Sequence, residues 1–164
     1  MEALEYLRDA KKNSEDSVAA TALLALAYAF TGRYPDWSDC AYELAQMPPR
    51  TAEDCLLKAQ AIMVVVDPEG AFKLAEEAME RRPTPLSLAV RAECRAWLAI
   101  HKASHTDAMF AVDDARAARK LLRDHRYVLQ ASLFTHIVAM ILADPDIPSI
   151  TGLREEADEI AMLL

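Results

Sequence analysis

Two histidines, His101 and His105, have the spacing that comes closest to a chemical site in this sequence. Side chains four residues apart lie on one face of a continuous helix, where two imidazoles can bind a zinc ion. The segment lacks the glutamate that helical zinc hydrolases place beside the first histidine, and both residues fall near a predicted helix end. Histidines at such an end also stabilise the terminal carbonyl groups. We therefore favour a solvated helix end, assign no metal, and keep a metal-dependent helical enzyme as an alternative.

The other candidates for catalysis are weaker. Asp113 and Asp114 are adjacent, and neighbouring residues on a helix point about 100 degrees apart, so the two carboxylates do not share a site. Cys94 and His101 are about two helical turns apart, with no third residue to orient them. The chain contains only 3 glycines and no glycine-rich phosphate-binding loop. We expect no catalytic residues, no cofactor and no enzymatic activity.

The composition favours a soluble protein. The chain has 164 residues, of which 53% are hydrophobic and 27% charged, enough for one domain with a buried core. The net charge of −8 argues against binding to nucleic acid or to an anionic membrane surface. No apolar run reaches the about 20 residues that span a bilayer, and the first residues lack the pattern of a secretory signal. Three cysteines, Cys40, Cys55 and Cys94, are expected to be reduced, buried thiols of a cytoplasmic protein.

Clusters of proline and glycine divide the chain into helical segments, because proline lacks the amide donor and clashes with the preceding turn. Helix-forming Ala, Leu, Glu, Lys and Arg fill the intervals. Thr51, with Asp54 three residues later, predicts an acidic capping box, and Asn13–Ser14, Asp36 and Asp107 are further candidate N-caps. The predicted helices are 2–12, 16–31, 36–47, 51–66, 69–82, 85–103, 107–124, 126–143 and 151–163.

Small residues recur at a regular spacing in alternate helices. Such residues four and three positions apart form a ridge that lets another helix approach closely. The matching sets are Ala71, Ala75 and Ala78; Ala111, Ala115 and Ala118; and, for the last two positions only, Tyr42 and Ala45. With Ala10 in the first helix, the last members of the sets are separated by 35, 33 and 40 residues. The chain is thus predicted to repeat a helical hairpin of about 34 residues.

A second pattern lies in the first helix of one hairpin. A leucine, a small residue, an aromatic residue and a glycine follow one another as Leu24, Ala25, Tyr28 and Gly32, and Tyr34 comes next. Together with the period, this pattern resembles that of the tetratricopeptide-repeat (TPR) family over most of the chain. The resemblance is best over residues 18–85. The alanine-rich helices also resemble repeats that are appended to large bacterial signalling proteins.

The resemblance implies an all-α fold in which antiparallel helical hairpins stack as a TPR-like right-handed superhelix, an α-solenoid. It implies one TPR-like domain over residues 1–164, as a module of a larger signalling protein. The expected parts are a capping or partial-repeat helix at 2–12, repeats at 16–50, 51–85 and 86–125, and a degenerate fourth repeat at 126–164.

In TPR arrays the first helices line a groove that binds peptides, so the resemblance implies a scaffold or regulatory module for protein–protein interaction. Its expected partner-binding residues are Leu26, Phe30, Gln60, Met63 and Arg91. The groove lacks the lysines and asparagines of the subfamily that binds acidic tails, and the acidic chain favours a partner with basic flanks. The alternative is a structural spacer or self-associating domain, in which Leu163 and Leu164 pair in a homodimer.

Overall fold

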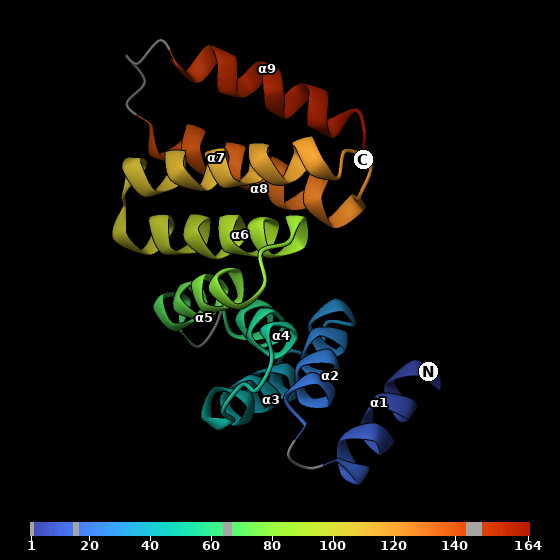
Figure 1. Ribbon diagram of the computed structural model, residues 1–164. Coiled ribbons are helices and arrows are strands. Elements are labelled where there is room, and N and C mark those ends of the chain that lie inside the picture. Colours follow the sequence, from blue (N-terminus) through green and yellow to red (C-terminus); the bar gives the residue numbers. More distant parts are fainter. Residues whose placement is uncertain (1, 15–16, 64–66, 144–148) are drawn as a thin grey trace. The chain divides into compact units, whose positions relative to one another are not determined.

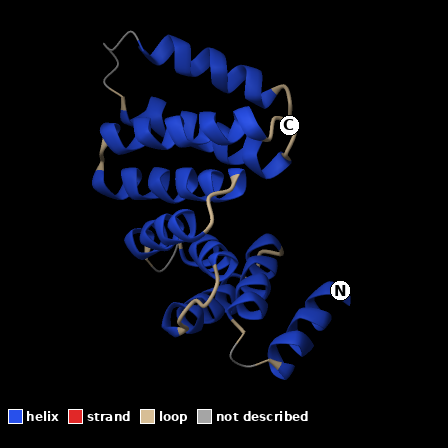
Figure 2. Ribbon diagram, in the orientation of Figure 1, coloured by secondary structure: helices blue, strands red, loops and turns tan. Residues whose placement is uncertain are grey.

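The structure, a computed structural model, describes residues 2–14, 17–63, 67–143 and 149–164 (Figure 1). The residues that it describes form helices joined by loops, without a strand among them (Figure 2). The prediction of an all-α protein is therefore confirmed. The helices are α1 (Glu2–Asn13), α2 (Val18–Phe30), α3 (Tyr34–Gln46), α4 (Ala52–Ile62), α5 (Pro68–Arg81), α6 (Pro85–Lys102), α7 (His105–Leu121), α8 (Arg126–Leu142) and α9 (Ser149–Ala161). Within this described part, none of the helices is long and apolar enough to cross a membrane.

The helix boundaries follow the proline and glycine clusters closely. The predicted capping box at α4 is confirmed: the Asp54 amide donates to Thr51 Oγ1, and the Thr51 amide donates to Asp54 Oδ2, both at 3.0 Å. The largest difference is at the end of α4, which was predicted at residue 66. The structure ends this helix at Ile62, and residues 64–66 lie outside the described part.

The other three predicted N-caps are wrong. Helix α7 is capped by Ser104, whose hydroxyl accepts a hydrogen bond from the Asp107 amide at 3.2 Å. Ser17 caps α2 in the same way, in place of Asn13–Ser14. Arg33 stands at the N-cap of α3 without a side-chain capping bond, and Asp36 lies inside the first turn. In the first two cases a serine directly before the first helical residue has its side chain within reach of the free amides.

The helices contact one another within two compact units, residues 1–81 and 82–164. In the first unit, α2 contacts α1, α3 and α4, and α4 contacts α3 and α5. The predicted ridge of α5 is fully buried at Ala71, Ala75 and Ala78. The ridge predicted in α3 is shifted by one residue: Tyr42 is exposed, whereas Ala41 and Leu44 are fully buried.

Helices α3 and α4 each donate a side-chain hydrogen bond to carbonyl oxygens at the C-terminal end of the other helix. The ammonium group of Lys58 in α4 is buried and donates to the carbonyl oxygens of Ala45 and Met47, at 2.9 and 2.6 Å. In return, the indole Nε1 of Trp37 in α3 donates to the Ala61 carbonyl at 3.3 Å. Carbonyls in the last turn of a helix lack partners within the helix. The two side chains therefore supply hydrogen bonds to carbonyl oxygens that would otherwise be buried without a donor. Burial of Lys58 lowers its pKa.

In the second unit, α6 contacts α7 and α8, and α8 contacts α7 and α9. The predicted ridge at Ala111, Ala115 and Ala118 is buried, as expected. Part of its core joins four helices and consists of Ala96, Ala99, Ala108, Ala111, Val112, Val138, Ala139 and Leu153. In both units an even-numbered helix and the odd-numbered helix after it form each hairpin, and the first helices of successive hairpins also contact each other.

Candidate interaction surfaces

In the first unit, three of the predicted partner-binding residues lie on the contacting helices α2 and α4, and Met63 follows the last residue of α4. Phe30, the last residue of α2, is 88% exposed, although it is a large apolar side chain. Leu26 and Gln60 are half-buried. Met63 is only 7% exposed, so a partner touches it only if its neighbours move. Phe30 is thus the most accessible apolar anchor of this set, and the role of all four residues stays a prediction.

In the second unit, side chains of α6 and α8 meet in cross-helix pairs. The Tyr127 hydroxyl of α8 donates to Glu93 Oε2 of α6 at 2.5 Å. The rings of Trp97 and Phe134 lie with their centroids 5.0 Å apart and their planes at 34°. Trp97 follows Glu93 by four residues, and Phe134 follows Tyr127 by seven. Both intervals return to the same helix face, so the two pairs lie along one shared surface.

Exposed isoleucines continue this surface beyond the aromatic pair. Ile100 of α6 and Ile137 of α8 are partly exposed, and Ile141 of α8 is 73% exposed. Ile100 follows Trp97 by three residues, and the two isoleucines of α8 follow Phe134 by three and seven, which keeps them on the same faces. We call this surface the α6–α8 face; it consists of Glu93, Trp97, Ile100, Tyr127, Phe134, Ile137 and Ile141.

The Glu93 carboxylate on this face lacks a cationic partner among the described residues. Burial raises its pKa, and the hydrogen bond from Tyr127 offsets only part of that effect. Arginines stand two positions before and two positions after it, but both turn toward α7. Arg91 donates to both carboxylate oxygens of Asp114, at 2.9 and 2.5 Å, and Arg95 lies 3.7 Å from the same carboxylate.

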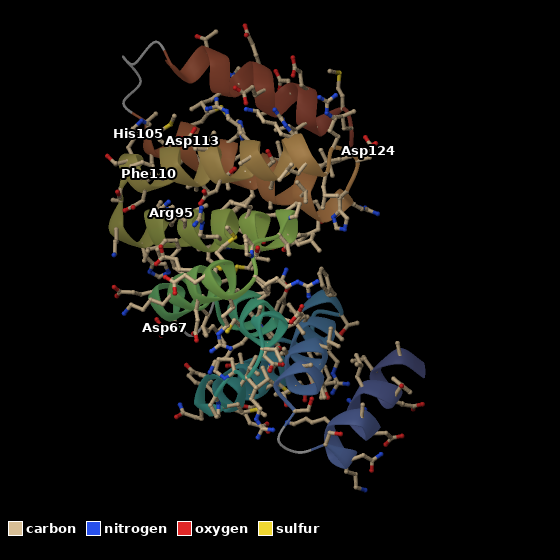
Figure 3. The ribbon with its side chains drawn as sticks, viewed as in Figure 1. Asp67, Arg95, His105, Phe110, Asp113 and Asp124 are labelled. Carbon is tan, nitrogen blue, oxygen red and sulfur yellow. The ribbon has the colours of Figure 1, made fainter. Side chains whose placement is uncertain are left out.

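Arg91 was predicted to contact a partner, and the structure places its guanidinium in this ion pair with Asp114. Arg95 also lies over the ring of Phe110, 5.0 Å from its centroid, and Figure 3 shows the two side chains as neighbours. Whether Arg91 exchanges Asp114 for a partner stays a prediction.

A second charged cluster joins α7, α8 and α9. Arg116 donates to both oxygens of Glu156, at 3.0 and 2.6 Å. The imidazole of His136, which is fully buried, places Nε2 3.0 Å from Glu156 and Nδ1 2.7 Å from the Ser132 carbonyl. The bonds from Arg116, with a smaller contribution from His136, lower the pKa of Glu156 to about 2. These groups satisfy one another and fix α9, so we assign them a structural role.

The premise of a metal site at His101 and His105 is wrong. Helix α6 ends at Lys102, Ala103 adopts a left-handed conformation with φ of 49°, and His105 begins the next helix. The two imidazoles therefore do not share a helix face. No group of three metal-binding side chains is found in the part of the chain that the structure describes.

All three cysteines are buried and unbridged, as predicted. Burial raises the pKa of each thiol, most strongly that of Cys94. A thiol whose pKa is raised is a poor nucleophile at neutral pH, because the thiolate is the reactive form. The cysteines therefore serve as small core residues.

Two open hollows lie elsewhere on the units. One, of about 410 Å³, is lined by Arg8, Lys11, Lys12, Leu24 and Glu43. The other, of about 480 Å³, is lined by Arg119, Lys120, Arg123, Asp124, Glu159 and Leu163. Each mixes both signs of charge at the surface, and neither of these two sets contains a buried, unpaired polar side chain.

Comparison of the chain with models of protein families, with curated proteins and with solved structures found no match.

Sequence reasoning missed most of the α6–α8 face. Glu93 and Tyr127 are 34 residues apart, which is one repeat length, so a secure register beyond residue 125 would have paired them. That register was not evident from the sequence, because the ridge positions in α9, the second helix of the last hairpin, are Leu153, Ala157 and Ile160, and only one of these residues is small. The cluster around Glu156 has no sequence signal, since it joins residues 20 and 40 positions apart.

Proposed function

We propose that the chain is a cytoplasmic protein–protein interaction module, built from TPR-like helical hairpins, that binds a partner segment on the faces of its first helices. The observation that carries this proposal is the α6–α8 face, on which aromatic and isoleucine side chains remain accessible in a chain of net charge −8. Exposed apolar side chains that cluster on one face, and that carry few charges, are typical of surfaces that bind other proteins.

The contacts between helices support the TPR-like part of the proposal. In each unit the first helix of a hairpin contacts its own second helix and the first helix of the next hairpin. This is the pattern that stacked hairpins produce, and it brings first helices side by side to form a binding face. The right-handed α-solenoid and the origin in a larger bacterial signalling protein rest on the sequence resemblance.

The position of α9 favours an accessible face. Among the described residues, α9 contacts α8, and its Glu156 and Leu153 pack against α7 and α8. Within that part of the chain, the backbone of α9 does not approach that of α6. The last helix therefore covers the α7 side of α8 and leaves the pairs between α6 and α8 uncovered.

The test is capture of partners from a lysate of the source cell with four matched baits. Phe30→Glu and Ile137→Glu each place a charge on a first-helix face, and Leu121→Glu changes a 64% exposed leucine at the end of α7 as the control. We expect the wild type and the control to retain a common protein that at least one of the other baits loses. All baits must show matching circular dichroism and melting. Equal retention by all four baits would contradict the proposal.

Self-association is a second candidate, because Met162, Leu163 and Leu164 are exposed and apolar, with Met162 at 80%. In this case the molar mass from sedimentation should rise with protein concentration. Replacement of Leu163 and Leu164 by serine should then restore the monomer. A constant monomeric mass across the concentration range would exclude this candidate.

A further inference from the structure

The Glu93 carboxylate is the one charged group among the residues that make up the α6–α8 face. It is half-buried, its Tyr127 partner is neutral, and both neighbouring arginines are held by Asp114. A phenol hydrogen bond stabilises a carboxylate but does not cancel its charge. A partly desolvated charge without a counter-charge is unfavourable, and a cation that reaches it from outside removes that cost.

The residues around Glu93 indicate which kind of ligand carries that cation. Trp97 lies one turn beyond Glu93, and Phe134 lies two turns beyond Tyr127; Ile100 and Ile137 follow them. Glu93 and Ile100 are seven residues apart on one helix, which corresponds to about 10 Å along the axis. A ligand that fits this surface carries a positive charge at one end and an apolar group about 10 Å away.

We propose that the α6–α8 face binds a partner peptide through a lysine or arginine that pairs with Glu93 and an apolar side chain that packs against Ile100 and Ile137. The Trp97 and Phe134 rings lie under the peptide between these two points. This inference rests on the proposed function, and it adds the chemistry of the partner. The choice of a basic segment follows from charge complementarity: the acceptor is an acidic group, and the whole chain has a net charge of −8.

The surface also excludes the opposite partner. An acidic side chain or a terminal carboxylate at this position would meet the Glu93 carboxylate in a partly desolvated site, where like charges repel strongly. The two arginines nearest to Glu93 in the sequence are paired with Asp114 on the α7 side and do not attract such a group. Basic peptides are thus selected both by attraction to Glu93 and by rejection of acidic competitors.

The experiment is selection from a random library of 12-residue peptides displayed on phage, with the full chain as bait. Four baits are compared: wild type, Glu93→Gln, Ile137→Glu, and Glu155→Gln as a control that removes one exposed negative charge from α9. We expect wild type and Glu155→Gln to enrich peptides with a lysine or arginine near apolar residues. Glu93→Gln should enrich apolar peptides without the basic residue.

A selected peptide then tests the pairing directly. Its affinity for Glu93→Gln should be weaker by about tenfold or more, since hydrogen bonds to charged groups contribute at least that factor. Replacement of the basic residue of the peptide by glutamine should weaken binding to wild type similarly and leave binding to Glu93→Gln unchanged. The peptide variant makes the test independent of how Glu93→Gln folds.

The remaining outcomes separate this inference from the proposed function. If wild type enriches apolar peptides without a basic residue and Ile137→Glu loses them, the face binds peptides but the role of Glu93 is wrong. If wild type enriches no peptide, or Ile137→Glu enriches the same ones, both the inference and the α6–α8 face as a binding surface are overturned.

Discussion

Replacement of Glu156 by glutamine should loosen α9 from the second unit in a pH-dependent way. Glu156 accepts two hydrogen bonds from Arg116, and Arg119 lies 3.7 Å away on the same helix α7. From α8, the buried His136 faces the same carboxylate. The two ring nitrogens of His136 face two hydrogen-bond acceptors, the Glu156 carboxylate and the Ser132 carbonyl. Glutamine keeps the shape of the Glu156 side chain but removes the negative charge that Arg116, Arg119 and His136 surround.

The magnitude follows from the pKa of Glu156. A decrease from 4.5 to about 2 corresponds to at most about 3 kcal/mol of stability at neutral pH. The side chain keeps 29% of its surface in contact with solvent, so screening reduces the value to about 1–2 kcal/mol. Since the folded-state pKa is depressed, this stability is present above the unfolded-state pKa and disappears as the pH decreases from 4.5 toward 2.

The assay is urea unfolding of wild type and Glu156→Gln, together with hydrogen exchange of the α9 amides. We expect Glu156→Gln to be less stable by about 1–2 kcal/mol at pH 7, with faster exchange in α9. The difference should fall by more than half between pH 7 and pH 3. Glu155→Gln, which has no ion partner in the described part of the chain, should lie within about 0.5 kcal/mol of wild type. A Glu156→Gln protein as stable as wild type at pH 7, or a difference of the same size at pH 3, would contradict this role of the Glu156 charge.

Three further substitutions test a buried hydrogen bond, a buried charge and the conformation of a turn. Lys58→Met retains much of the buried aliphatic volume but leaves the Ala45 and Met47 carbonyls without their hydrogen-bond donor. The free energy of unfolding in urea should therefore decrease by about 1–3 kcal/mol. An unchanged free energy of unfolding would mean that water replaces the ammonium group. Because burial raises the pKa of Glu93, its charge opposes folding at pH 7; Glu93→Gln should melt higher than wild type there, and the gain should vanish as the pH falls below the ordinary pKa of glutamate. An equal or lower melting temperature of Glu93→Gln at pH 7 would contradict the stated environment. Gly32 has φ of 71° and open space where a Cβ would lie, so Gly32→Ala should cost about 1 kcal/mol through the backbone alone, measured by urea unfolding; an unchanged stability would mean that the turn rearranges.

The sequence predicted the helices well because their ends depend on local chemistry. Proline and glycine interrupt helices wherever they occur, and the Thr51–Asp54 capping box needs only residues three apart. The wrong caps illustrate the limit of this approach. Asp107 and Ser104 are both good capping residues, and the choice between them depends on where α6 ends, which is fixed by the left-handed Ala103.

Contacts between helices were predicted less well, because they depend on the register between hairpins. The prediction assumed that every ridge position holds a small residue. In α3 the buried ridge residues are Ala41 and Leu44, so a leucine occupies one of these positions. With Leu44 as its last member, the interval to Ala78 is 34 residues, closer to the expected period than the 33 from Ala45. The Glu93–Tyr127 pair depends on the same kind of register, and no local pattern marks it.

Partner binding by the first-helix faces is tested most directly by site-specific photo-crosslinking in the source cell. A benzophenone amino acid is placed at Phe30, at Ile137, or at Leu121 as the exposed control outside the first helices. We expect an adduct of one additional protein, of the same mass in repeated experiments, from Ile137 or Phe30 and not from Leu121. The same adducts from all three positions, or adducts from Leu121 alone, would contradict the claim that the first-helix faces bind the partner.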